Sequence, residues 1–188
     1  LWMQQKLLFS GIRPISTIID ITNYILIELG QPLHAFDIAN IQGKKIIVKQ
    51  ALENEEFQTL DEETHKLNKN ALLICDTKKP VALAGVMGGK NSEINEKTQD
   101  VLLEAAYFHP TNIRRTATKL GLRTESSIRF EKGVDIQKTD FASQRACYLI
   151  QELAQGQVCK TVKIGIDKNN QAYKNLAINF SCSDINQL

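Results

Sequence analysis

The chain has 188 residues, of which 43% are hydrophobic and 23% are charged, and its formal net charge is +2. This is ordinary usage for a globular protein, so the composition excludes a wholly disordered chain. No apolar run approaches the roughly 18 residues that a membrane-spanning helix needs, and the first residues lack the pattern of a signal peptide. We therefore expect a folded, cytoplasmic protein with no membrane partner.

Charge is spread unevenly along the chain. Residues 53–63 carry six acidic side chains and no basic one, whereas residues 114–132 carry six basic side chains and two acidic ones. The basic segment is suited to a phosphate-bearing partner, and the acidic segment is not. A solvated helix surface explains the basic segment equally well, so both interpretations stay open here.

The cysteines lie far apart and include no C-x-x-C pair or histidine at metal-ligand spacing: they are Cys75, Cys147, Cys159 and Cys182. Because a structural zinc site needs clustered ligands, we expect reduced thiols and no metal site.

The chain is predicted to begin with two helices. The first covers residues 1–10 and ends at Gly11. The second follows Ser16, a favourable N-cap, carries apolar residues at helical spacing, and ends at Gly30. Its Thr22 and Asn23 lie about 100° apart around the helix axis, so the two side chains can share one end of a pocket.

A turn set by Pro32 follows and brings His34 between apolar residues. Beyond it we expect short strands at residues 45–51, 71–76, 81–84 and 101–108. Between the last two strands, residues 84–89 hold three glycines, which permit either a tight bend or a close approach of backbone amides to a ligand. The segment lacks the spacing of known phosphate-binding loops.

Glu104 interrupts the apolar run of residues 101–108. Strand alternation places Leu102 and Ala106 on the same face as Glu104. Because burying an unpaired carboxylate is costly, Glu104 belongs either on the solvent face of an edge strand or in a site with a partner. Its apolar neighbours favour a lined pocket.

The remaining predicted elements are a helix at residues 110–120 that Gly121 ends, a polar loop at 123–129, a helix at 138–154 closed by Gly156, and strands at 158–166 and 176–180. The series predicts an α+β fold, a single compact module of short mixed or antiparallel strands with helices packed against them.

Residue types and spacing nominate candidates for a hydrolytic or ligand-binding site, but they define no reaction. The candidates are Thr22, Asn23, His34, Glu104 and Thr124. They are scattered along the chain, and neither a nucleophilic triad nor a metal cage is evident among them.

Six segments, in order, closely resemble the third and fourth domains of the beta subunit of bacterial phenylalanyl-tRNA synthetase. They are GIRPI at residues 11–15, DITNY at 20–24, LGQPLHAFD at 29–37, LAGVMGG at 83–89, VLLEAAYF at 101–108 and RFEKGVD at 129–135. The resemblance implies an editing domain at residues 1–158. It also implies that residues 159–188 are connecting strands and the truncated start of the next domain, so we expect a piece of a longer polypeptide.

The resemblance implies post-transfer editing, in which the ester of tyrosine wrongly attached to tRNA(Phe) is hydrolysed in support of ATP-dependent phenylalanine–tRNA ligation by the whole enzyme. The implied partners are the 3′ end of tRNA(Phe), the tyrosine or phenylalanine moiety, and the catalytic alpha subunit and other beta domains of a heterotetramer. No cofactor is expected in this fragment, since ATP and magnesium are bound elsewhere. A non-catalytic tRNA-binding or structural scaffold module is the alternative.

The resemblance also assigns roles at the tyrosine ring and the ester. Glu104 and the backbone amide of Gly85 match positions that hold the tyrosine phenol, and His34 matches an editing histidine that orients water near the ester. We expect residues 34, 85 and 104 to open onto one common hollow.

The other matched positions surround this centre. Thr22, Asn23 and Arg13 match positions near the amino-ester end and the terminal adenosine, and Thr124 matches a wall of the pocket. Ser126 stands where the family often has alanine, so its hydroxyl is expected to add a polar contact or narrow the pocket.

Overall fold

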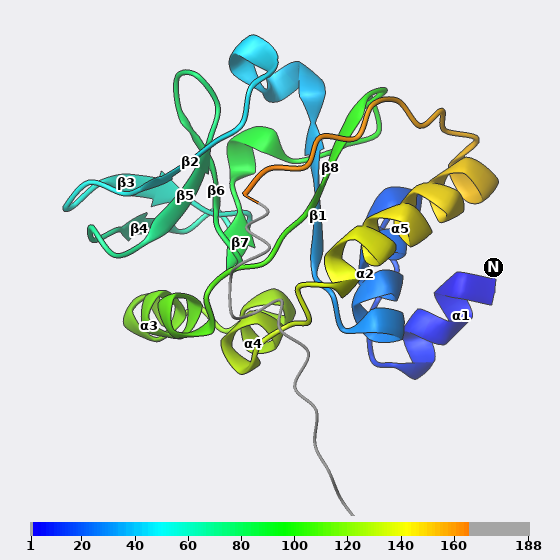
Figure 1. Cartoon of the computed structure of the whole chain (residues 1–188), viewed down its shortest axis with the longest axis horizontal. Coiled ribbons are helices and arrows are strands. Elements are labelled where there is room, and N and C mark those ends of the chain that lie inside the picture. The colour runs from blue at the N-terminus through cyan, green and yellow to red at the C-terminus, as the bar shows by residue number, and fades with distance from the viewer. Residues whose placement is uncertain (1, 166–188) are drawn as a thin grey trace, which may run out of the picture. The chain divides into compact units, whose positions relative to one another are not determined.

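The computed structural model describes residues 2–165 (Figure 1). The helices are α1 (Trp2–Phe9), α2 (Thr17–Leu29), α3 (Pro110–Leu120), α4 (Glu125–Lys132) and α5 (Lys138–Ala154). The strands are β1 (Leu33–Asp37), β2 (Ile47–Gln50), β3 (Glu56–Gln58), β4 (Thr64–Lys66), β5 (Leu72–Cys75), β6 (Pro80–Leu83), β7 (Met87–Gly88) and β8 (Val101–Ala105). Short 3₁₀ turns lie at Ile38–Asn40, Gln42–Lys44 and Lys90–Ser92.

The chain divides into two compact units, Leu1–Val158 and Cys159–Leu188. All of the helices and strands named above belong to the first unit. Of the second unit, residues 159–165 are described, and they lie outside helices and strands.

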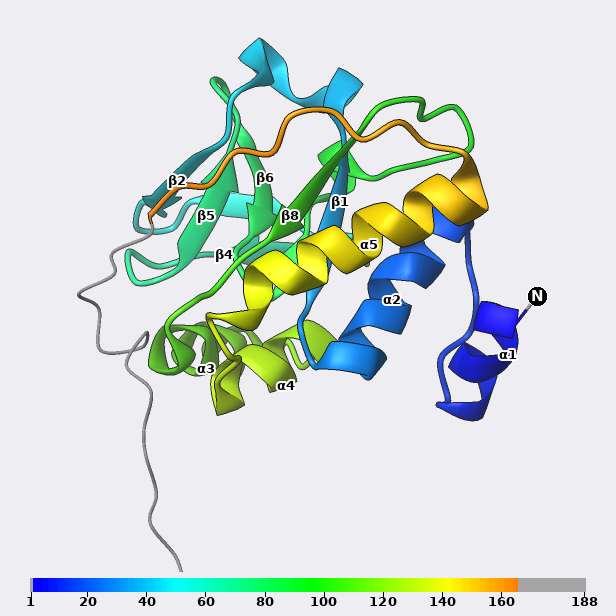
Figure 2. The ribbon, with the colours of Figure 1, turned by 45° about the vertical axis from the view of Figure 1, so that its right-hand side comes forward.

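The strands form three antiparallel sheets. One has the order β2-β5-β6-β7, and β1-β8 and β3-β4 are two-stranded. The β1-β8 ladder lies between the four-stranded sheet and the helices α2 and α5 (Figures 1 and 2). The arrangement confirms the predicted α+β fold, with antiparallel pairing throughout the described residues.

Two apolar cores flank the β1-β8 ladder. The core of the helical layer joins α1, α2 and α5 through Met3, Leu7, Ile21, Ile25, Ala142, Ala146 and Leu149, with Leu33 and Leu103 of the ladder packed against it. The larger core lies on the sheet side and includes Phe36, Leu73, Val81, Leu83, Phe108 and Phe130, with Leu102 and Ala106 packed against it. Each fully buried aliphatic or aromatic side chain stabilises the fold by about 2 kcal/mol.

Helix α2 forms where the apolar periodicity predicted it. Ser16 is the N-cap but makes no side-chain cap bond; instead the Asp20 carboxylate accepts a hydrogen bond from the Ile15 N–H at 2.7 Å. Gly30 ends the helix in the left-handed conformation, and its N–H bonds to the Leu26 carbonyl. This ending turns the chain directly into β1.

Two predictions for the C-terminal half are wrong. The polar segment 123–129 is not a loop but largely helix α4, because Thr124 and Ser127 form a reciprocal capping box that starts a helix there. Residues 158–165 form no strand, while residue 166 and the strand predicted at 176–180 lie outside the described residues. Helix α5 forms as predicted, but its C-cap is Gln155 in the left-handed conformation and not Gly156.

The predicted strand boundaries need smaller corrections. The strand expected at residues 101–108 ends at Ala105, and β1, β3, β4 and β7 were not predicted. The β3 and β4 strands have only three residues each and expose their flanking side chains, so they carry too short an alternating pattern to be recognised.

Candidate functional site

The β1-β8 ladder brings His34 and Glu104 together, although 69 residues separate them in the sequence. His34 pairs directly with Glu104 in the antiparallel register, and Phe36 pairs with Leu102. Side chains of directly opposed residues lie on the same face of a sheet. Phe36 and Leu102 pack into the sheet-side core, so His34 and Glu104 also face the four-stranded sheet.

The imidazole of His34 is half-buried and contacts Phe36 and Gly88. Its ring packs edge-on to Phe36, with 4.5 Å between ring centroids. On the sheet side it abuts Gly88 of β7, where an added Cβ would come within 2.5 Å of the His34 Cε1. Burial lowers the pKa of His34 from 6.5 to about 4, so the imidazole is neutral at pH 7.

One carboxyl oxygen of Glu104 is buried without a hydrogen-bond partner among the described residues. Although the residue as a whole keeps some exposed surface, its Oε2 atom is inaccessible to solvent and has no hydrogen-bond partner among the described residues. Burial raises the pKa of Glu104 from 4.5 to about 7. The site thus holds an acceptor oxygen for which the described part of the chain provides no donor.

Gly85 lies in a tight bend between β6 and β7. Its φ is +69°, and an added Cβ would come within 2.8 Å of both Ile113 and Phe108. The structure shows the tight bend, and the close approach of the Gly85 amide to a ligand stays a prediction. The structure also shows why glycine is required here: the backbone is left-handed, and α3 and the chain before it leave no room for a side chain.

The N-terminus of α4 holds this bend in place. The Thr124 hydroxyl donates to the Val86 carbonyl at 2.7 Å while accepting from the Ser127 N–H as the helix cap. The Ser126 hydroxyl donates to the Gly85 carbonyl at 3.3 Å. Gly85, Thr124 and Ser126 therefore form one cluster, and the hydroxyl of Ser126 makes its polar contact with the protein backbone.

Arg13, Thr22 and Asn23 lie on or before α2, apart from these contacts. Thr22 is buried, and its hydroxyl donates to the Ile19 carbonyl within the helix at 2.8 Å, whereas Arg13 is exposed. Among the described residues, no hydrogen bond, ion pair or ring contact joins these three side chains to His34 or Glu104. Their predicted roles at the amino-ester end and the adenosine stay predictions.

Gln31 was not identified from the sequence, yet it fixes the end of the ladder. Its side chain is 1% exposed, and its Nε2 donates to the carbonyls of Pro32 and Ala106 at 3.1 and 2.9 Å. These bonds fasten the start of β1 to the end of β8, two residues from Glu104. A polar side chain between Gly30 and Pro32 was the available signal for this role.

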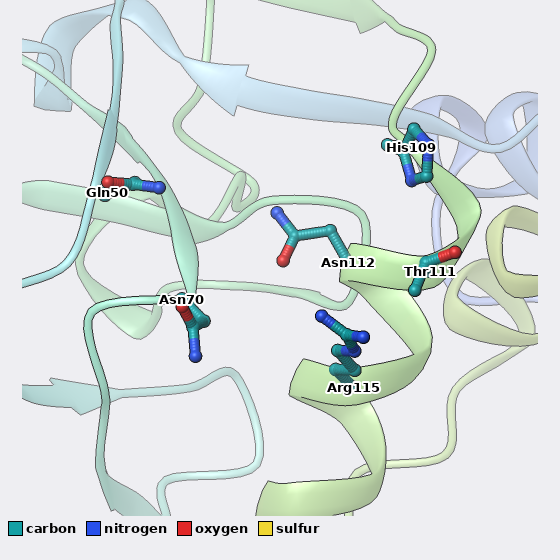
Figure 3. Close-up of a pocket in the computed structure, with 6 residues that line it drawn as sticks. All are labelled: Gln50, Asn70, His109, Thr111, Asn112 and Arg115. Atoms are coloured by element: carbon teal, nitrogen blue, oxygen red, sulfur yellow. The ribbon is translucent and has the colours of Figure 1, made fainter.

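Two surface hollows are described, and both lie elsewhere. One of about 260 Å³ is lined by Gln50, Asn70, His109, Thr111, Asn112 and Arg115 (Figure 3). The other, of about 350 Å³, lies between α1 and α2. Neither is lined by His34, Gly85 or Glu104, so neither is the common hollow that the sequence led us to expect. A ligand reaching Glu104 Oε2 must displace side chains that now cover it.

Among the described residues, no group of three or more histidine, cysteine, aspartate or glutamate side chains is placed to hold a metal ion. No helix in that part of the chain is long and apolar enough to cross a membrane.

These features define a class of protein: an α+β module in which a histidine and a glutamate are paired on one face of a two-stranded ladder. Its sequence matches the family described as the B3/4 domain over residues 1–155, and the chain belongs to that family.

Three similar curated proteins are each named phenylalanine–tRNA ligase beta subunit, which confirms the resemblance seen in the sequence. The protein from Oceanobacillus iheyensis is 54% identical over 158 residues, which is 84% of this chain and 20% of that protein. The protein from Oleidesulfovibrio alaskensis is 55% identical over 156 residues, which is 83% of this chain and 20% of that protein. The protein from Syntrophus aciditrophicus is 45% identical over the whole chain and 23% of its own length. The chain thus spans about a fifth of the relatives it matches.

Proposed function

We propose that this chain carries the post-transfer editing site of a phenylalanine–tRNA ligase and hydrolyses the ester of tyrosyl-tRNA(Phe). In this proposal it acts in the cytoplasm as part of a beta subunit, together with a catalytic alpha subunit and the remaining beta domains. The observation that carries the proposal is the pairing of His34 with Glu104 on one interior face, where Glu104 keeps a buried oxygen without a donor.

The unpartnered Glu104 oxygen is suited to recognising tyrosine by its phenol. A pocket for phenylalanine cannot strongly reject a ligand that merely adds a hydroxyl, whereas a site built to hydrogen-bond that hydroxyl discriminates by about 10⁴ against its absence. The phenol donates to Glu104 Oε2, and the backbone N–H of Gly85 donates to the phenol oxygen. Phenylalanine leaves both groups without a partner, which is unfavourable in a buried site.

His34 acts at the ester bond in this proposal. Because its pKa is about 4, the imidazole is neutral at pH 7 and is a weak base. It therefore orients and polarises a water molecule, which attacks the ester carbonyl with help from the terminal ribose hydroxyl of the tRNA. An activated ester needs little more than positioning, which supplies a large part of the rate in well-oriented reactions.

The other candidate residues complete the proposed site. Thr124 contributes its methyl group to the pocket wall, since its hydroxyl is already used by the helix cap and the Val86 carbonyl. Ser126, whose hydroxyl bonds to the Gly85 carbonyl, is assigned to the wall of the proposed pocket beside Gly85. Thr22, Asn23 and Arg13 are assigned to the amino-ester end and the terminal adenosine.

The experiment is deacylation of tyrosyl-tRNA(Phe) by the assembled ligase carrying His34→Ala. We expect the rate to fall by about 100-fold, the lower range for loss of a positioned acid–base group. His65→Ala, the same substitution on β4 outside the site, is the matched control and should change the rate less than twofold. Equal rates for wild type and His34→Ala would remove His34 from the mechanism.

A scaffold module within the same subunit is the second candidate. Apolar side chains remain uncovered near α1, where Phe9 is 93% and Leu8 59% exposed, which favours docking against another part of a larger protein. A scaffold predicts that His34→Ala leaves deacylation unchanged, so the same experiment separates the two functions.

A further inference from the structure

Each of the six residues that line the hollow beside α3 carries a side-chain hydrogen-bond donor. Figure 3 shows Asn112 and Arg115 projecting from α3 toward Gln50 and Asn70 on the opposite wall. His109 and Thr111 line the end near the start of the helix. The lining includes amide, hydroxyl, imidazole and guanidinium groups and no carboxylate, so it favours an anionic ligand that accepts several hydrogen bonds.

Local electrostatics add to this preference. The hollow lies at the first turn of α3, an 11-residue helix with Pro110 in its first turn, where the helix dipole favours negative charge. Among the described residues, Arg115 forms no ion pair, and neither does Lys119 one turn further along the helix. The acidic segment 53–63 contributes no lining residue, and its Glu53 accepts a hydrogen bond from the Lys69 N–H.

The size of the hollow indicates what carries the anion. Its volume of about 260 Å³ exceeds what a single inorganic phosphate fills and has room for a phosphate with an adjoining sugar. The uncompensated positive charge also extends along α3 to Lys119, beyond the hollow. Two cations one helical turn apart, the first of them in the hollow, are suited to contacts with the phosphates of a nucleic-acid backbone.

We propose that the hollow formed by these six residues binds a phosphate group of an RNA strand, so that α3 is a tRNA-contacting helix outside the site of ester hydrolysis. The choice of tRNA as the RNA rests on the proposed function, whereas the phosphate site is argued from the hollow alone and does not depend on that function.

The test measures binding of tRNA(Phe) to the 188-residue chain as a function of salt concentration, with Arg115→Gln as the variant. We expect about fivefold weaker binding and a salt-dependence slope reduced by about one, because one phosphate contact is lost. Arg114→Gln is the matched control, since it removes the same charge from the neighbouring exposed position and does not line the hollow. If both variants weaken tRNA binding equally, the attraction is a general effect of positive charge, and the proposed phosphate site is wrong.

A second pair of variants adds a charge in place of removing one. Asn112→Asp places a carboxylate in the hollow and should weaken tRNA binding by about tenfold, whereas Thr118→Asp, exposed on the same helix, should weaken it less than threefold. Similar losses from both would contradict the proposal. Thermal unfolding of each variant verifies that it folds.

The source of the phosphate is distinguished by competition. Millimolar AMP should displace little tRNA, whereas displacement of tRNA by micromolar AMP would show a free-nucleotide site and overturn the RNA assignment. The two proposals fail separately. Equal deacylation rates for wild type and His34→Ala overturn the editing proposal, whereas equal tRNA binding by wild type and Arg115→Gln overturns the phosphate site.

Discussion

The two faces of the β1-β8 ladder share one backbone and one register, yet they bury different chemistry. The face toward α2 and α5 presents Leu33 and Leu103 and adds to an apolar core. The face toward the four-stranded sheet presents His34 and Glu104 at the matching positions. Packing alone would favour apolar residues on both faces, so the two polar groups on the second face lower the stability of the fold. Such a loss of stability is typical of functional sites.

The largest expected effect comes from placing a carboxyl group on the apolar face. Leu103→Glu should lower the free energy of unfolding at pH 8 by about 4 kcal/mol, because it buries an unpaired carboxylate against the helical core and removes an apolar contact. Urea unfolding at that pH measures the change. A loss below 1 kcal/mol would mean that the two faces do not differ as described.

The pH dependence of stability should separate Glu104 from the surface carboxylates. The folded-state pKa of Glu104, about 7, lies above its ordinary 4.5, so the native protein holds its proton more tightly and loses stability as pH rises from 4.5 through 7. The free energy of unfolding of Glu104→Gln minus that of wild type should therefore rise by about 3 kcal/mol across this window.

For His34, stability should change with pH in the opposite direction. Its folded-state pKa, about 4, lies below its ordinary 6.5, so wild type gains stability as pH rises from 4 to 6.5. The free energy of unfolding of His34→Phe minus that of wild type should therefore fall by about 3 kcal/mol over that range. If the difference in free energy of unfolding between either variant and wild type does not change with pH, the replaced group is solvated in the native protein.

Replacing the buried acid itself should stabilise the protein. Glu104→Leu is expected to raise the free energy of unfolding at pH 8 by about 2 kcal/mol, since it removes a desolvated carboxylate from beside Leu102. The same variant should lose its preference for tyrosyl esters. Destabilisation by Glu104→Leu would indicate a structural partner for the carboxylate and would contradict a role reserved for the ligand.

The smallest effect tests the contact between Gly88 and the imidazole. Gly88→Ala places a Cβ within 2.5 Å of His34 Cε1, so the ring must shift. We expect deacylation to slow by about tenfold, the effect of a displaced catalytic group, with a stability loss of about 1 kcal/mol. Gly156→Ala, whose added Cβ crowds the Ile150 side chain and not His34, is the control for the added methyl and should leave deacylation unchanged.

Local patterns in the sequence predicted the features that depend on neighbouring residues. Helix α2 follows from apolar periodicity and Gly30, and the burial of Glu104 follows from strand alternation between Leu102 and Ala106. Helix α4 was missed because a Thr124–Ser127 capping box is weaker in sequence than its glutamate-containing form.

The arrangement of the site depends on contacts that no local pattern contains. The pairing of His34 with Glu104 joins strands that lie far apart in the sequence, and β1 has only five residues, interrupted by a histidine. The bonds from Gln31 to Ala106 and from Thr124 to Val86 are equally long-range. The resemblance to a known family nominated His34 and Glu104 but not Gln31, and the strand register then showed that His34 and Glu104 meet.

The central claim is that Glu104 recognises the phenol of a tyrosyl ester opposite His34. The most direct measurement is the ratio of the deacylation rates of tyrosyl-tRNA(Phe) and phenylalanyl-tRNA(Phe) by the assembled ligase, with and without Glu104→Ala. We predict that the substitution lowers this ratio by about 100-fold or more, because the hydroxyl loses its buried acceptor. An unchanged ratio would contradict the assignment of Glu104.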